Sequence, residues 1–97
     1  MIELRYTGMA FDEQELIDFM KASDLQHMVQ GQTIRAFEQH TKPLSLDVWL
    51  RNYFPQKRDT KLADNYVIDA LVKTGKFIAK REECPKTGRR CKAIRLV

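Results

Sequence analysis

The sequence predicts a small α+β protein that is mainly helical and ends in a β-hairpin. Through most of the chain, apolar side chains recur at helical spacing, and these segments follow residues that are favourable N-caps. From residue 77 onward the spacing changes from 3.6 to 2, which is the period of a strand. A length of 97 residues, with 43% hydrophobic and 31% charged residues, is typical of one folded domain over 1–97.

The N-terminal region predicts a short strand followed by a helix. Residues 2–6 alternate weakly between apolar and polar side chains, and Thr7-Gly8 closes this run. Asp12 is a good N-cap, and Glu15 follows three residues later at the spacing of a capping box. We therefore expect a helix over about 12–22.

A second helical segment is predicted to begin at Ser23 or Asp24 and to end before Pro43. Its apolar positions start at Leu25 and continue to Phe37. Gly31 in the middle weakens a helix by about 1 kcal/mol relative to alanine. The pattern therefore fits either one bent helix or two helices.

A short apolar helix follows, with Ser45 as its cap and Pro55 as its stop, in the sequence SLDVWLRNYF. Its aromatic side chains resemble a platform on which nucleobases could stack. Because they crowd into one apolar segment, we expect them in the core instead. They are Trp49, Tyr53 and Phe54.

The next helix is predicted over about 60–74, with Asp59 or Thr60 as its cap and Gly75 just after its end. One side of this helix is apolar and is expected to face the core. The opposite side carries the polar residues Lys61, Asn65, Asp69 and Lys73.

Two alternating runs at the C-terminus predict a β-hairpin whose turn is centred on Thr87-Gly88. With a two-residue turn there, paired residue numbers sum to 175, and Glu83 faces Lys92. The apolar residues then share one face, and a slip of two residues leaves them on that face. These residues are Phe77, Ala79, Ile94 and Leu96.

The net charge of +4 is divided unevenly along the chain. Residues 1–50 hold four Lys and Arg against eight acids, whereas residues 51–97 hold thirteen against five. The first half therefore carries −4 and the second +8. A cationic end attracts polyanions, and nucleic acid is the commonest polyanion in a cell.

Residues 44–97 resemble the winged-helix (winged helix-turn-helix) family in the order of their elements. LDVWLRNYF corresponds to a first helix, TKLADNYVIDALVKTG to a second, and KFIAKREECPKTGRRCKAIRLV to a β-wing. Residues 1–42 would then be an N-terminal strand and helix extension. The resemblance implies that the second helix lies in the major groove of duplex DNA and that the wing contacts the adjacent backbone.

The resemblance selects nine residues as candidates for nucleic-acid binding. Lysine and arginine would neutralise phosphates, and the Asn65 amide suits the edge of an adenine. Asp64 and Asp69 argue against this role, since carboxylates on a groove-facing helix repel phosphate. The nine are Lys57, Arg58, Lys61, Asn65, Lys73, Lys86, Arg89, Arg90 and Lys92.

Other interpretations of the same features stay open. The wing cations serve equally well to keep an edge hairpin soluble, and Asn65 is an ordinary solvated helix residue in most such sequences. The alternative function is a protein-protein interaction or homodimerisation module with no nucleic-acid partner. Regulation of transcription is the role that the first interpretation suggests.

Cys84 and Cys91 flank the predicted turn and would face each other in the 175 register. They form a candidate redox pair, although two reduced thiols are the default inside a cell. His27 and His40 lack the spacing of metal ligands, so no metal or other cofactor is expected. No catalytic motif is present in the sequence, and we do not expect an enzyme.

No apolar run approaches the roughly 20 residues that a membrane-spanning helix needs. Glu3 and Arg5 interrupt the region where a signal peptide carries its apolar stretch. The sequence therefore predicts a cytoplasmic protein that does not contact a membrane.

Overall fold

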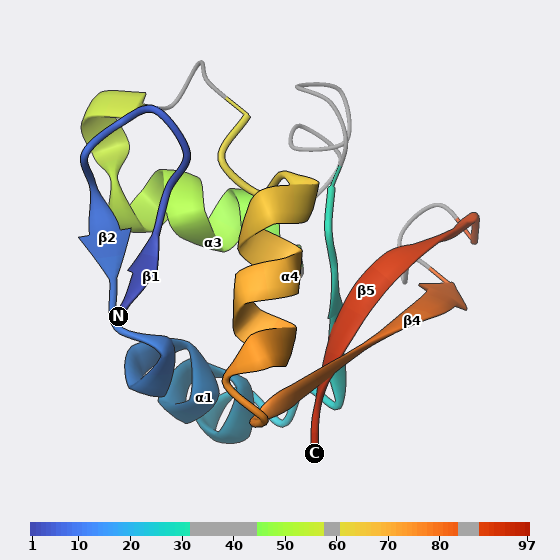
Figure 1. Ribbon diagram of the computed structural model, residues 1–97. Coiled ribbons are helices and arrows are strands. Elements are labelled where there is room, and N and C mark those ends of the chain that lie inside the picture. Colours follow the sequence, from blue (N-terminus) through green and yellow to red (C-terminus); the bar gives the residue numbers. More distant parts are fainter. Residues whose placement is uncertain (32–44, 58–60, 84–87) are drawn as a thin grey trace.

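Three α-helices and two antiparallel sheets make up the computed structural model, which describes residues 1–31, 45–57, 61–83 and 88–97 (Figure 1). The helices are α1 (Glu13–Ala22), α3 (Leu46–Tyr53) and α4 (Asn65–Lys73), and a short 3-10 helix, η1 (Pro55–Lys57), follows α3. The strands are β1 (Ile2–Glu3), β2 (Ala10–Phe11), β3 (His27–Val29), β4 (Phe77–Glu83) and β5 (Arg90–Leu96).

The capping residues mark where α1 and α3 begin. Asp12 Oδ1 accepts a hydrogen bond from the backbone N–H of Gln14 at 2.9 Å, and Ser45 Oγ accepts one from Val48 at 3.1 Å. These bonds satisfy backbone donors that have no partner within the helix. The predicted helix over 12–22 and the predicted cap at Ser45 are both confirmed.

Helix α4 begins later than its sequence pattern predicts. Its cap is Asp64, whose Oδ1 accepts a hydrogen bond from the N–H of Val67 at 3.1 Å. The prediction that Asp59 or Thr60 caps this helix is therefore wrong. Residues 61–64 before it are extended or irregular, because the backbone N–H groups of Leu62 and Ala63 donate to the buried carboxylate of Asp47. At the other end, Gly75 has φ +78° and follows the last turn as expected.

Strand β3 lies where the sequence pattern predicts a helix. Asp24 adopts a left-handed φ of +54°, and His27–Val29 then pairs antiparallel with β5, Met28 opposite Ile94. Met28 and Val29 are fully buried there. A three-residue run has little conformational preference of its own, so pairing with a distant strand overrides it. The rest of the predicted second helix, residues 32–44, lies outside the described residues.

The predicted fold class, a mainly helical winged helix-turn-helix with a C-terminal β-hairpin wing, is wrong. Within the described residues the structure is a small α+β fold with five strands in two sheets beside three α-helices. The strand order β3-β5-β4 places β5 in the middle of a sheet, so β4 and β5 do not form a separate hairpin wing among the described residues. The prediction failed because β3 comes from the half of the chain that was expected to be helical.

Strands β4 and β5 pair antiparallel, but two residues out of the predicted register. Phe77 faces Leu96 and Arg81 faces Lys92, so paired numbers sum to 173. Glu83 therefore faces Arg90 and not Lys92. A slip of two preserves the faces, and Phe77, Ala79, Ile94 and Leu96 lie on one face as predicted. This face packs on α4 and the other helices.

One hydrophobic core joins residues from both halves of the chain, from Ile2 to Ile94. Trp49 is 8% exposed and meets Phe11 edge-to-face, with ring centroids 5.5 Å apart. The prediction that the aromatic residues of α3 form core is confirmed for Trp49, while Tyr53 lies at the core margin. Among the described residues, no helix has the length and apolar character to cross a membrane.

Candidate functional site

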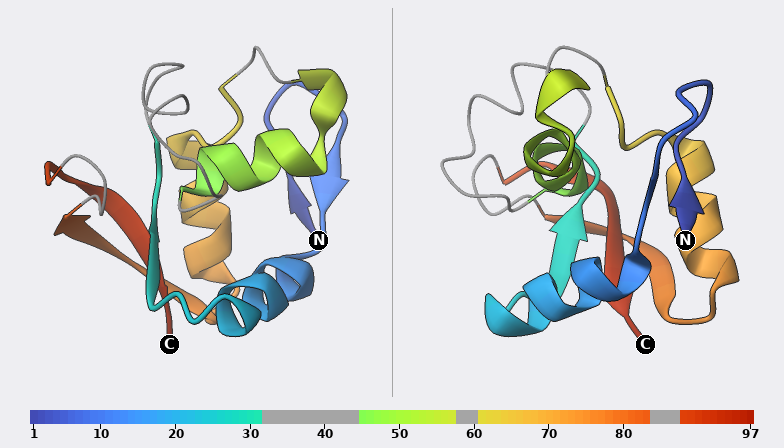
Figure 2. Two further views of the ribbon diagram at one scale, coloured as in Figure 1. Left: turned by 180° about the vertical axis from the view of Figure 1, so that it is seen from behind. Right: turned by 90° about the vertical axis from the view of Figure 1, so that its left-hand side faces the viewer.

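Three cations lie on one face of the β4–β5 pair. Arg81 faces Lys92 across the strands, and Arg90 lies on the same face one pair further along. Beyond Ala79 and Ile94 this face no longer covers core, and the two strands run past the helices (Figures 1 and 2). The alternation of the strands therefore places apolar side chains over the helices and cations beyond them.

Backbone carbonyls hold two of these cations in place. Arg81 Nη2 donates to the carbonyl of Arg90 at 3.3 Å, and Arg90 Nη2 donates to the carbonyl of Arg81 at 3.2 Å. Neither guanidinium has an ion-pair partner among the residues that the structure describes. The two hydrogen bonds thus orient the positive charge of both side chains.

Lys92 connects this face to the first turn of α4. Its Nζ donates to Asn65 Oδ1 at 3.3 Å, and Asn65 is exposed at the start of the helix. Lys61 is exposed just before the helix. We call the surface formed by Arg81, Arg90, Lys92 and Asn65, with Lys61 beside it, the cationic surface.

A buried polar network places α4 against β5. Asp47 Oδ1 on α3 accepts from the N–H groups of Leu62 and Ala63, at 2.8 and 3.1 Å. Asp47 Oδ2 lies 2.8 Å from Arg51 Nη2, and both side chains are 2% exposed. This pair fixes the backbone that enters α4, which explains why the helix starts at Asn65.

Gln30 extends the same network to the sheet. Its Nε2 donates to the carbonyl of Ala63, and its backbone N–H donates to the carbonyl of Lys92 at 2.7 Å. The segment before α4 and the strand that carries Lys92 are therefore bonded to one buried residue. This arrangement fixes the position of the start of α4 relative to Lys92 on β5.

Four acidic side chains lie near the cationic surface, and only some of them reduce its positive charge. Asp64 caps α4, and Glu82 lies on the opposite face of the sheet, where Arg95 Nε binds its Oε1 at 2.5 Å. Asp69, one helical turn after Asn65, is exposed, and Glu83 lies opposite Arg90. Asp69 and Glu83 therefore offset part of the positive charge of the cationic surface.

Of the nine residues predicted for binding, the structure brings Asn65, Arg90 and Lys92 together. Lys61 and Arg89 are exposed close to them in the chain. Lys73 ends α4, about 12 Å from Asn65 along the helix axis at 1.5 Å per residue, and Lys57 is half-buried in η1. Arg58 and Lys86 lie outside the described residues.

The predicted facing of Cys84 and Cys91 is wrong for the register that the strands adopt. Cys91 is half-buried and lies opposite Glu82, on the face away from Lys92. Cys84 lies outside the described residues, so the redox pair stays a prediction. No group of three or more potential metal ligands occurs in the described part of the chain.

Sequence reasoning missed Arg81, the residue that pairs with Lys92. The sequence did contain the pattern that would identify Arg81, because Phe77, Ala79 and Arg81 are spaced two residues apart and therefore share one face of a predicted strand. It also missed the buried network, whose signal was a charged pair four residues apart, Asp47 and Arg51, inside an otherwise apolar helix.

The ion pair on the opposite face of the sheet predicts acid sensitivity. The Arg95 guanidinium, through its hydrogen bond and its charge, holds the pKa of Glu82 below its ordinary value of 4.5. On acidification the unfolded chain therefore takes up this proton first, and stability is lost as pH falls below 4.5 through the folded-state pKa. We expect Glu82→Gln to be less stable than the wild type at pH 7 and to lose less stability between about pH 5 and 3.

Thermal unfolding at a series of pH values measures this effect. Glu83→Gln is the matched control, because its carboxylate has no ion-pair partner within the described residues. Parallel pH profiles for Glu82→Gln and the wild type would contradict the assignment.

Comparison of the chain with protein-family models, curated proteins and solved structures found no match. The charges and contacts of the cationic surface are therefore the basis for assigning a function.

Proposed function

We propose that this protein binds nucleic acid without catalysing a reaction, with duplex DNA as its main partner, through the cationic surface. The observation that carries the proposal is the alignment of Arg81, Arg90 and Lys92 on one face, joined to α4 by the Lys92–Asn65 hydrogen bond. Oriented cations that form no salt bridge within the described residues suit phosphate groups, because binding releases the counterions condensed on the nucleic acid.

The neighbouring helix suits a duplex. An exposed helix fits the major groove, which is about 12 Å wide, and cations beside the helix then meet the phosphates that border the groove. Asn65 lies in the first turn of α4, and an amide can both donate to and accept from the edge of an adenine. Phosphate contacts would supply most of the affinity, and Asn65 would supply what base preference there is.

Removing two cations of this surface is the direct test. We expect Arg81→Ala with Arg90→Ala to weaken duplex binding by about tenfold or more at moderate salt. The slope of log K against log salt should fall by about one unit for each lost phosphate contact. Fluorescence anisotropy with a labelled duplex at several salt concentrations measures both quantities.

The control variant removes two positive charges that lie outside the cationic surface. Lys21 lies in the last turn of α1, and Lys76 precedes β4 at the end of the strand away from Arg81. Lys21→Ala with Lys76→Ala should leave the salt slope within about half a unit of the wild type. Equal losses in the two double variants, or no binding by the wild type at low salt, would refute the proposal.

The sequence also predicts an alternative function, a protein-interaction or homodimerisation module. The same protein samples distinguish this alternative from nucleic-acid binding. A chain that forms a stable dimer in size-exclusion chromatography with light scattering, and that does not bind the duplex, would support that alternative.

A further inference from the structure

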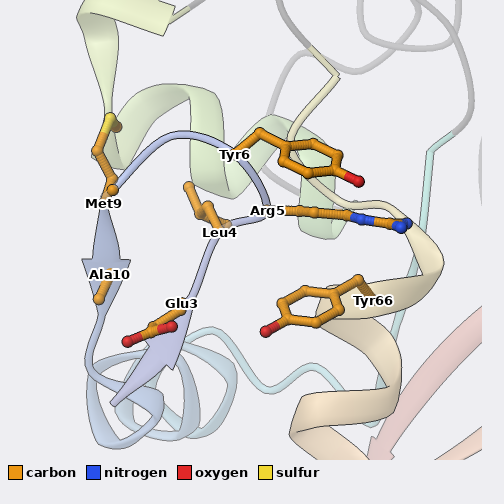
Figure 3. Close-up of a pocket in the computed structure, with 8 residues that line it drawn as sticks. Glu3, Leu4, Arg5, Tyr6, Met9, Ala10 and Tyr66 are labelled. Carbon is orange, nitrogen blue, oxygen red and sulfur yellow. The ribbon is translucent and has the colours of Figure 1, made fainter.

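An arginine between two tyrosines forms a second feature beside α4. The Arg5 guanidinium carbon lies 5.0 Å from the ring centroid of Tyr6 and 5.9 Å from that of Tyr66. Figure 3 shows Arg5 extending between the two rings, with Tyr6 on the connection between β1 and β2 and Tyr66 on α4. We call these three residues the stack.

The side chain of Tyr6 does not pack into the hydrophobic core. Its side chain is 92% exposed, and its backbone has a left-handed φ of +62°. That conformation costs a residue with a side chain about 1–2 kcal/mol, and no burial of the ring offsets the cost. Strained residues that contribute no packing concentrate at functional sites.

The turn that carries Tyr6 is held firmly. The Leu4 N–H donates to the carbonyl of Met9 at 2.8 Å, and Thr7 Oγ1 donates to the carbonyl of Leu4 at 3.1 Å. The N–H of Met9 in turn donates to Thr7 Oγ1 at 3.1 Å. These bonds hold the backbone on which the Tyr6 ring is presented to solvent, which reduces the ordering of the turn that a ligand must offset on binding.

An open pocket of about 440 Å³ lies beside the stack. Its lining includes Leu4 and Met9 as apolar walls, with Glu3, Arg5, Tyr6 and Tyr66 as the residues that bring polar groups. Flat aromatic surfaces beside a guanidinium favour a planar, electron-rich ring that also carries hydrogen-bonding edges.

The stack adjoins the cationic surface. Tyr66 follows Asn65 in the first turn of α4, and Asn65 accepts from Lys92. A nucleic-acid strand held at Lys92 would therefore pass over the first turn of α4 to reach Tyr66. An aromatic side chain of a protein partner would stack equally well, but the neighbouring cations favour a ligand that also carries phosphate groups.

We propose that the stack binds an unpaired nucleobase of the same nucleic acid that the cationic surface holds, an inference that rests on the proposed function. The base lies against the exposed ring of Tyr6, and Arg5 contributes its charge to the base or to the adjoining phosphate. The preferred ligand is then a duplex with a single-stranded extension or an unpaired base. Since every base has a π-face, the preference depends little on sequence.

Three labelled probes test the inference. The first is a blunt duplex, the second carries an overhang of about three nucleotides, and the third carries the same overhang without bases, with both polarities tested. We expect the wild type to bind the overhang with bases on the order of tenfold more tightly than the abasic one. Tyr6→Ala with Tyr66→Ala should remove this difference and leave affinity for the blunt duplex unchanged.

A 2-aminopurine in the overhang reports stacking directly, because its fluorescence falls when it stacks on an aromatic ring. The quenching should be lost in the double alanine variant and kept in Tyr6→Phe, which retains the ring. Tyr6→Gly also lacks the ring but tolerates the positive φ, so it should melt higher than Tyr6→Ala and still lose the quenching. This pair separates loss of the site from loss of stability.

The outcomes distinguish the two proposals. If the wild type binds the blunt duplex but does not distinguish bases from abasic sites, the stack inference is wrong and the proposed function stands. A preference for bases that persists without both rings also overturns the inference. If the wild type binds none of the probes at low salt, both proposals are wrong.

Discussion

Replacing Asp47 with alanine is expected to destabilise the protein by about 3–5 kcal/mol, a large share of the total stability of a domain this size. The carboxylate accepts from Leu62 and Ala63 and pairs with Arg51. Its loss leaves two backbone N–H groups and a buried guanidinium without this acceptor, which costs more than the interaction itself contributes. Urea denaturation followed by circular dichroism measures the change in the free energy of unfolding.

Two further variants show whether the loss of the Asp47 carboxylate beside Arg51 is the cause. Asp47→Asn retains one oxygen acceptor for the N–H groups, so it should lose less stability than Asp47→Ala. Asp47→Leu with Arg51→Met removes both charges and should also be more stable than Asp47→Ala, because a buried pair replaced by apolar residues is often near neutral. A cost below about 1 kcal/mol for Asp47→Ala would show that the network does not hold α4.

Phe11→Ala is expected to cost about 3–5 kcal/mol, by opening a cavity where the small sheet meets α3. The side chain of Phe11 is fully buried, and its ring centroid lies 5.5 Å from that of Trp49 and 6.3 Å from that of Tyr53. The surrounding side chains belong to separate elements and close the cavity only in part. Urea denaturation monitored by Trp49 fluorescence reports both the loss and the changed surroundings of the indole.

Phe11→Leu is the graded control for the cavity. It removes less volume, so its cost should lie clearly below that of Phe11→Ala. Phe19→Ala is the positional control, because Phe19 is only half-buried at the margin of the same core. If Phe11→Ala and Phe19→Ala cost the same, the core is not centred on the Phe11–Trp49 contact.

The local elements followed from the sequence where a short-range interaction decides them. The caps Asp12 and Ser45 each bond within three residues, so their helices could be predicted correctly. The shared face of Phe77 and Ile94 was also predictable, because a period of two survives a register slip of two.

The candidate site was predictable only in part. The excess of cations in residues 51–97 pointed to Arg90 and Lys92. It could not show that Arg81 and Arg90 bond to each other's backbone, since that depends on which residues face each other across the strands.

The sequence by itself determined the caps of α1 and α3, the two alternating strands and the concentration of positive charge near the C-terminus. Each depends on residues close in the chain or on a period that neighbouring residues carry. Only the tertiary structure decided that residues 27–29 form a strand, that α4 starts at Asn65 and that Arg5 lies between Tyr6 and Tyr66. These features depend on contacts between distant segments, whose energies outweigh local preference and leave no periodic signal in the chain.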